Sequence, residues 1–378
     1  VVGDRVELHD WRVLSLGVVL WLESCRPPGR PLEPPGLIVL ECRLGRHSST
    51  IDNGWVAAWR QGSWRGHAAP PSARLLGMTM PLPALSLAAV PGRRAATIDL
   101  AVEIEARGFS GIYCPSFGDA MGLCHAMAVA TETIEFGTSI VNMYTRHSAD
   151  YAQSAAFIHE TSGGRFRFGV GVSHGPMNDR LGIDTGKPLS DTRAFVAACR
   201  GAERIGELPP IVLAALRDKM VALAADIADG VTFANVSRSY VPTTLEHLRA
   251  SGDVGDSFFV GNMIPTCISD DIDAAAAVNR RTLVMYVGLP NYRNYWKQAG
   301  YAEEMDAIEA AIGAGDREAV PSLMSDRWLR DVTLYGSATQ VRDGLEAWYD
   351  AGVTTPILVP SSATGGQIKA FEELFAIF

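Results

Sequence analysis

Two short polar segments each follow an apolar run, and they hold the residues of this chain best suited to chemistry. The segment 142–147 reads NMYTRH and follows the run 134–141, and Ser-His-Gly at 173–175 follows the run 166–172. Histidines titrate near neutrality and can move protons, whereas asparagine, serine and arginine side chains hydrogen-bond to polar ligands. The pattern indicates a site for acid–base chemistry or for binding a polar ligand.

The second segment combines a titratable side chain with an approachable backbone. His174 could donate or accept a proton, or it could be a hydrogen-bonding residue in the wall of a pocket. Gly171 and Gly175 let a ligand approach the main chain, and the successive N–H groups around Ser173 can cradle an anion. We therefore expect Gly171, Ser173, His174 and Gly175 to contact a ligand.

A strand–helix–strand unit positions both segments. Residues 149–160 carry apolar side chains at helical spacing, and Ser162-Gly163-Gly164 ends that helix. The runs on either side have the length and β-branched content of buried strands, so two parallel strands are expected. Ligands gather at the carboxyl ends of such strands, which is where the polar segments lie.

Two further strand ends carry candidate residues. Ser116 and Phe117 follow the run 111–114 and would line a pocket, and Asp119 is either an acid or the N-cap of the next helix. The residues that follow the run 211–215 open another helix, whose N-terminus favours phosphate. Arg217 and Lys219 add positive charge that strengthens this preference for phosphate, or they only form a charged first turn of the helix. The four candidates of this turn are Leu216, Arg217, Lys219 and Met220.

From residue 80 onward, strand and helix patterns alternate. Eight strands with intervening helices in about 300 residues predict a closed parallel (β/α)8 TIM barrel, with an open doubly wound sheet as the alternative. Residues 272–334 are mostly helical and too long for one crossover, so we expect a helical insertion before the eighth strand. The strand patterns are 85–90, 111–114, 136–141, 166–172, 211–215, 230–234, 258–268 and 355–359, and the helical patterns are 98–107, 123–131, 150–160, 191–204, 219–227 and 337–351.

The order of several sequence pieces resembles one protein family. The pieces are TSIVNMYTRH, HETSGGRF and GVGVSHG, followed downstream by PPIVLAALRDKMVALAADIADGV and YGSATQVRDGLEAWYDAGVTTPILVPSS. Together they resemble the luciferase-like monooxygenase superfamily, in particular its deazaflavin branch, over residues 81–378. The resemblance implies coenzyme F420 as a dissociable hydride carrier, with FMN as the alternative cofactor, and a homodimer.

The resemblance also implies roles for individual residues. The pair that aligns with Ser139-Ile140 forms a cis peptide in the family and supports the coenzyme ring from behind. Asn142 would point its amide at the polar edge of that ring, or it caps the following turn. His174 aligns with an acidic residue that acts in proton transfer in a related sugar-phosphate dehydrogenase, and the turn at 216–220 holds the coenzyme's phosphate-bearing tail.

The segment after the second strand departs from the family pattern. Many relatives carry Asp-His where this chain has Ser116-Phe117, and that histidine is their catalytic acid–base. We therefore do not expect a mechanism that needs this histidine, and Phe117 would instead form an apolar wall beside the ring.

Composition narrows the functions further. The net charge is −9 and no basic cluster is followed by aromatic residues, so we expect no nucleic-acid partner. The six cysteines have neither CxxC nor zinc spacing, which indicates reduced thiols, no metal and a cytoplasmic location. The apolar run 13–22 is too short to span a bilayer, so we expect no membrane association.

Residues 1–77 differ from the remainder of the chain. They hold five tryptophans and three proline pairs, show no sustained strand or helix period apart from one short run, and precede Met78 and Met80. We predict that they are an upstream extension from a misplaced start codon, largely disordered, with a genuine appended segment as the alternative. The barrel domain would then span residues 80–378.

One function is preferred and two alternatives remain. The preferred function is an oxidoreductase that transfers a hydride between F420 and a small organic substrate. The second is an FMN-dependent monooxygenase that uses reduced flavin and oxygen. The third is a non-catalytic flavin-binding barrel, which the missing Asp-His pair motivates. The sequence lacks GxGxxG, GxxxxGK[ST], GxSxG and HExxH motifs, which weakens hydrolase functions.

Overall fold

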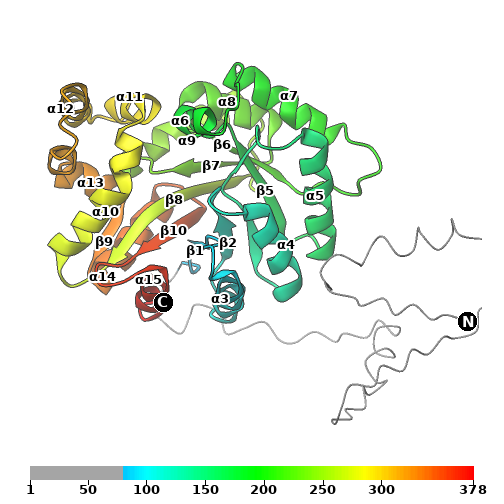
Figure 1. The fold of residues 1–378 in the computed structure, drawn as a ribbon, viewed down its shortest axis with the longest axis horizontal. Coiled ribbons are helices and arrows are strands. Elements are labelled where there is room, and N and C mark those ends of the chain that lie inside the picture. The colour runs from blue at the N-terminus through cyan, green and yellow to red at the C-terminus, as the bar shows by residue number, and fades with distance from the viewer. Residues whose placement is uncertain (1–79) are drawn as a thin grey trace, which may run out of the picture. The chain divides into compact units, whose positions relative to one another are not determined.

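Parallel strands form one closed sheet in the computed structural model, which describes residues 80–378. The strands are β1 (Ala84–Ser86), β2 (Gly111–Cys114), β3 (Glu135–Thr138), β4 (Val141–Asn142), β5 (Phe166–Gly171), β6 (Ile211–Ala214), β7 (Gly230–Ala234), β8 (Phe259–Ile268), β9 (Leu334–Gly336) and β10 (Thr355–Ser361). They hydrogen-bond in the order β10-β1-β2-β3-β5-β6-β7-β8, and β10 also pairs with β8. The ring is therefore an eight-stranded barrel (Figure 1).

Helices connect the strands and cover the outside of this barrel (Figure 1). They are α3 (Arg94–Ala106), α4 (Ala120–Ala130), α5 (Ser148–Thr161), α6 (Gly175–Arg180), α7 (Pro188–Arg200), α8 (Asp218–Ile227), α9 (Val241–Ser251), α10 (Ile272–Val287), α11 (Pro290–Gln298), α12 (Ala302–Gly313), α13 (Asp326–Val332), α14 (Ala338–Asp350) and α15 (Gln367–Phe375). The helices α10 to α13 form the predicted insertion between β8 and the last strand.

The closed barrel confirms the predicted fold class over the open sheet. The strands β2 and β7 have the predicted bounds, whereas the run 136–141 is divided into β3 and β4. A short strand that was not predicted follows the insertion: β9 pairs with β8, where Leu334 lies opposite Thr266. The long β8 extends past β7 and offers β9 an edge for pairing.

Side chains fill the barrel interior near the amino ends of the strands. Ala84, Tyr113, Val212, Phe259 and Ile357 form one buried cluster there, and the rings of Tyr113 and Phe259 lie 5.3 Å apart. A second, larger apolar cluster joins the outer face of the sheet to the helices. Because the inner cluster closes the amino end of the barrel, an interior cavity remains only toward the carboxyl end.

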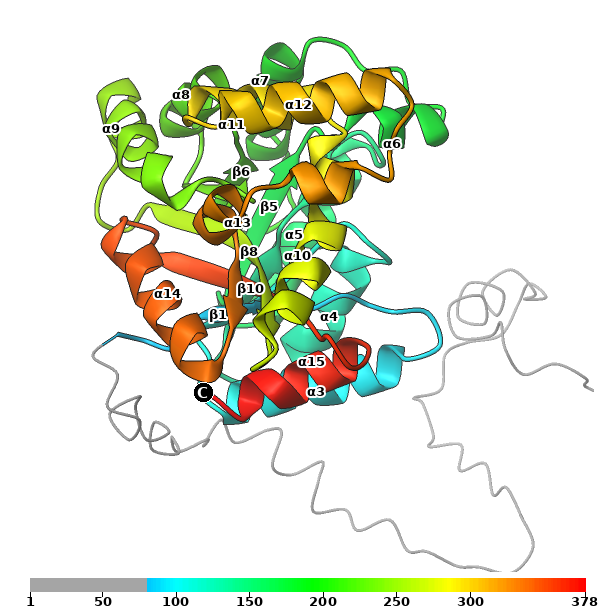
Figure 2. The ribbon, with the colours of Figure 1, turned by 90° about the vertical axis from the view of Figure 1, so that its left-hand side faces the viewer.

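The last helix packs beside the first helix of the described residues (Figure 2). The ring of Phe375 on α15 lies 5.8 Å from that of Phe109, and the guanidinium of Arg107 lies 4.3 Å above the Phe375 ring. These contacts fix α15 against the α3 side of the barrel.

The predicted extension at residues 1–77 lies outside the described residues. Within residues 80–378, no helix is long and apolar enough to cross a membrane. The four cysteines of this part, Cys114, Cys124, Cys199 and Cys267, are buried free thiols.

Candidate active site

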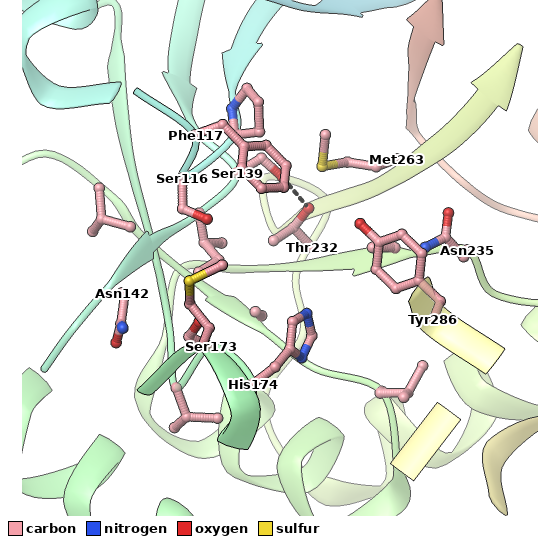
Figure 3. A pocket seen from close by; sticks show the side chains of 18 of the residues that line it. Ser116, Phe117, Ser139, Asn142, Ser173, His174, Thr232, Asn235, Met263 and Tyr286 are labelled. Atoms are coloured by element: carbon pink, nitrogen blue, oxygen red, sulfur yellow. Dashed lines mark hydrogen bonds between the residues drawn. The ribbon is translucent and has the colours of Figure 1, made fainter. Parts of the chain in front are cut away.

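A cavity of about 1390 Å³ opens at the carboxyl ends of the barrel strands. Every barrel strand contributes to its wall, through residues in the strand or directly after it, and α10 and α11 of the insertion border it as well. Figure 3 shows side chains of this wall. The volume exceeds the range of about 300–1,000 Å³ that is typical of small-molecule sites, so the cavity can hold a coenzyme together with a second molecule.

The chain between β3 and β4 forms part of this wall, and the peptide bond between Ser139 and Ile140 is cis. The Ser139 N–H donates to the Cys114 carbonyl at 2.7 Å, and the Ser139 hydroxyl lies 3.1 Å from that of Thr232 on β7 (Figure 3). Behind this segment, a Cβ at Gly169 would lie only 1.8 Å from the Thr138 carbonyl oxygen. Glycine at 169 is therefore what permits this close approach of β3 and β5.

Two of the glycines expected at the ligand lie outside the cavity wall. A Cβ at Gly171 would lie 2.8 Å from the Ala214 side chain and 3.1 Å from that of Ile140, so Gly171 serves the packing of β5 against its neighbours. Gly175 begins α6 and is exposed. Ser173, between them, does line the cavity and has a positive φ of 59°.

Asn142 lines the cavity, but protein partners engage its amide. Its side-chain nitrogen donates to the Asn178 Oδ1 at 2.8 Å, and its oxygen accepts from the Tyr144 N–H at 3.1 Å. Asn178 in turn donates to the Val172 carbonyl at 3.0 Å. Asn142 therefore caps the turn after β4, which is the second of its two predicted roles, and the asparagine pair ties that turn to α6.

His174 borders the cavity at the start of α6. Its ring lies edge-on to two tyrosines of the insertion, 6.1 Å from Tyr286 and 5.9 Å from Tyr292. Burial lowers the pKa of His174 below its ordinary value of 6.5, so the imidazole is neutral at pH 7. A neutral imidazole has one donor and one acceptor nitrogen, so the geometry fits both the acid–base and the wall-residue interpretation.

Asp119 also borders the cavity, and its carboxylate is used by the protein. One oxygen accepts the Gly122 N–H at 2.9 Å and so caps α4, and the same oxygen lies 3.6 Å from Arg146. Arg146 also approaches Asp150 at 3.8 Å. The contacts match the N-cap interpretation of Asp119. Ser116 and Phe117 line the cavity as predicted, and the Phe117 side chain is 53% exposed at its mouth.

The turn between β6 and α8 brings positive charge to the cavity. Leu216 and Met220 pack against the core, whereas Arg217 and Lys219 are exposed along the cavity wall. Arg217 is the N-cap residue of α8, and its side chain makes no capping bond among the described residues. Both cations are thus available to a ligand. No cluster of three or more metal-binding side chains occurs within residues 80–378.

Sequence reasoning missed several residues of this wall. Asn235 directly follows β7, and the logic that identified the other strand ends would have found it. Met285 and Tyr286 lie on α10, inside a helical insertion with no local signal for a site. The wall residue Met263 lies within β8. The alternation of side chains along this strand does not reveal which of its two faces points into the barrel.

Comparisons with known proteins identify the family. The sequence profile of the luciferase-like monooxygenase family matches residues 52–355, so the chain belongs to this family. It is 26% identical over 280 residues to a 5,10-methylenetetrahydromethanopterin reductase of Methanolobus tindarius, covering 66% of this chain and 85% of that protein. It is 24% identical over 283 residues to a putative coenzyme F420-dependent oxidoreductase of Mycobacterium tuberculosis, covering 62% and 81%.

Solved structures also share the fold of this chain. The structure of the coenzyme F420-dependent tetrahydromethanopterin reductase of Methanopyrus kandleri is similar with a TM-score of 0.63 and 20% identity. The similarity covers 78% of this chain and 97% of that one.

Proposed function

We propose that this oxidoreductase transfers a hydride between coenzyme F420 and a small organic substrate. The observation that carries the proposal is an excess of positive charge along one arc of the cavity wall, where four cations outnumber the aspartates Asp119 and Asp218. Arg146 lies in the loop after β4, Arg180 is the last residue of α6 after β5, and Arg217 and Lys219 lie at the start of α8 after β6. Such a set suits a coenzyme with a phosphate-bearing, anionic tail. The sequence relative named as a putative coenzyme F420-dependent oxidoreductase supports the same cofactor.

The residues next to these cations fit the ring of a deazaflavin. Ile140, Val172 and Ala215 offer an apolar surface in the cavity wall. Ser173 has a positive φ and presents its backbone on the same arc. Ile140 and Val172 would support the ring, and the turn at 216–220 would hold the tail. When bound, the deazaflavin supplies or accepts the hydride.

The chain's own residues would orient the substrate and exclude water. The neutral His174 would donate or accept a proton at a substrate atom. Phe117 lines the cavity and has no titratable group, so it would contribute only an apolar contact. A substrate whose reduction needs an acid–base at that position is therefore not expected. The homodimer stays a prediction.

The role of the cationic turn can be tested by titrating the full chain with F420 and with a tail-less deazaflavin. Arg217→Ala and Lys219→Ala should each weaken F420 binding about tenfold, because each removes a charge-assisted contact to the tail. Neither variant should change the affinity for the tail-less compound. Arg193→Ala is the matched control, since Arg193 pairs with Asp226 away from the cavity. Equal F420 affinity in all variants would contradict the proposed tail site.

An FMN-dependent monooxygenase remains the second candidate, because the family that the profile matches is named for that activity. Tighter binding of FMN than of F420 would favour this function over hydride transfer. Binding of neither cofactor would favour the non-catalytic barrel.

A further inference from the structure

Charge is divided unevenly around the cavity wall. All its Asp, Lys and Arg side chains lie between residues 119 and 219, on the arc that runs from β2 to β6. The opposite arc consists of β7, β8, β10 and β1, together with α10 and α11. Among the described wall residues of that arc, none carries a charge. The cavity therefore has one arc for an anionic molecule and one arc for an uncharged molecule.

The uncharged arc is apolar except at a few points. Met263 and Pro265 come from β8, and Val359 and Pro360 come from β10. Met285 on α10 is 46% exposed at the mouth of the cavity. Methionine side chains adapt their shape to apolar ligands of different outlines. A ligand on this arc would thus be recognised by apolar contact and by whichever polar groups the arc provides.

Asn235 is the most constrained of those polar groups. Its backbone N–H donates to the Met263 carbonyl at 3.0 Å, and its carbonyl accepts from the Trp296 indole at 3.1 Å. Its φ of 56° is a conformation that asparagine tolerates better than most residues. The residue is only 3% exposed and lines the cavity, yet its side-chain nitrogen has no hydrogen-bond partner within the described structure.

Tyr286 supplies a second polar group close to Asn235. In Figure 3 its hydroxyl is directed toward the interior of the pocket, with Thr232 and Asn235 nearby. Burial raises the pKa of Tyr286, whereas the Asn235 side chain, which lies close to the phenol oxygen without a well-formed hydrogen bond to it, acts in the opposite direction; the phenol remains protonated at neutral pH. A buried donor without a partner is unfavourable. A ligand oxygen that accepts the phenol hydrogen would lie close to the Asn235 side chain, and a small rotation of the buried amide would let the same oxygen accept from it as well.

We propose that Asn235 and Tyr286 hold an oxygen atom of the substrate, and that the arc around them selects an uncharged, largely apolar molecule. This inference rests on the proposed function, because it assigns the anionic arc to the coenzyme. Asn235 and Tyr286 are then specificity-determining residues of the same reaction. A substrate with carboxylate or phosphate groups on this arc would lose their hydration without gaining a cation.

The test uses the full chain with two matched ligands and two readouts. Benzylacetone is the uncharged probe, and its para-carboxylate derivative has the same skeleton with one added charge. F420 binding is measured first by fluorescence, and binding of each probe to the F420-loaded protein is then measured by calorimetry. The variants are Tyr286→Phe, which removes only the hydroxyl, and Asn235→Gly, because glycine accepts a positive φ. Tyr335→Phe is the control, since the Tyr335 hydroxyl is buried and has no partner within the described residues but does not line the cavity.

We expect benzylacetone to bind the wild type at least tenfold more tightly than the carboxylate derivative. Tyr286→Phe and Asn235→Gly should each weaken benzylacetone binding by about three- to tenfold, the effect of one hydrogen bond, and should leave F420 binding within twofold. Tyr335→Phe should change neither. Equal binding of both probes, unchanged binding in Tyr286→Phe and Asn235→Gly, or no benzylacetone binding to F420-loaded protein would overturn the inference. Failure of F420 itself to bind would instead overturn the proposed function.

Discussion

Replacing Asp119 separates its two possible roles, acid and helix cap. In the structure the Asp119 carboxylate accepts the Gly122 N–H at 2.9 Å, and a Cβ at Gly122 would lie only 2.5 Å from the other carboxylate oxygen. The carboxylate is thus held directly over the first turn of α4. Asparagine caps helices as well as aspartate does, but it cannot act as a general acid or base. Asp119→Asn should therefore keep the cap, and Asp119→Ala should lose it.

The expected sizes follow from these contacts. Loss of an N-cap costs about 1 kcal/mol, and the pair with Arg146 adds no more than about 1 kcal/mol because the two side chains are 56% and 38% exposed. Asp119→Ala should lower the free energy of unfolding by about 1–2 kcal/mol, which corresponds to a Tm lower by about 2–3 °C for a domain of about 300 residues. Asp119→Asn, which keeps the cap and loses only the pair with Arg146, should lower it by no more than about 1 kcal/mol.

Thermal and urea denaturation of the full-length variants, followed by circular dichroism, would measure these differences. Turnover with F420 should be retained in Asp119→Asn if the residue only caps α4. Equal destabilisation by both substitutions would refute the assignment of the cap. A stable Asp119→Asn protein that binds F420 but has lost turnover more than a hundredfold would show that Asp119 is an acid after all.

Three other predictions concern stability. Gly169→Ala would place a Cβ 1.8 Å from a backbone oxygen and should lower the free energy of unfolding in urea by about 3 kcal/mol or more, whereas Gly175→Ala meets open space and should stay within about 0.5 kcal/mol of the wild type. The Glu105 carboxylate accepts hydrogen bonds from the backbone N–H groups of residues 132, 133 and 134. Burial alone would raise the pKa of Glu105, but these hydrogen bonds lower it below 4.5. Its stabilisation should therefore be lost as the pH falls below 4.5, and Glu105→Gln should cost about 1–3 kcal/mol at pH 7 and flatten the acid branch of the stability curve. Burial lowers the pKa of His174 below 6.5, so as the pH falls below 6.5 the histidine is protonated in the unfolded chain before it is protonated in the folded protein. The folded protein therefore loses stability below this pH, and His174→Gln should reduce that loss. A pH–stability curve that is the same in the variant would contradict this prediction.

Most of the barrel could be predicted from the sequence because its strands are short apolar runs between turn signals. Gly230–Ala234 is such a run, and its predicted bounds hold in the structure. The helices α9 and α15 and the short strand β9 were not predicted. β9 is stabilised by pairing with the end of β8 that extends past β7, and the local sequence of β9 carries no signal for this distant partner.

The candidate site could be predicted only where chemistry follows a strand directly. The turn at 216–220 and the loop at Ser173 and His174 do line the cavity. Gly171 lies in the same glycine-rich segment as Ser173 and His174, but it packs against Ala214. The sequence does not show which neighbour a strand residue contacts, since only the fold decides this. Tyr286 enters the site from an insertion far along the chain, so no spacing in the sequence connects it with Asn235.

The most direct test of the account is a paired titration of the full-length chain with F420 and with FMN, followed by absorbance and fluorescence. The account predicts micromolar or tighter binding of F420 and clearly weaker binding of FMN, with F420 affinity falling as salt rises because the cations at the cavity mouth are exposed. Tighter binding of FMN, or binding of neither cofactor, would contradict hydride transfer by F420 as the function of this protein.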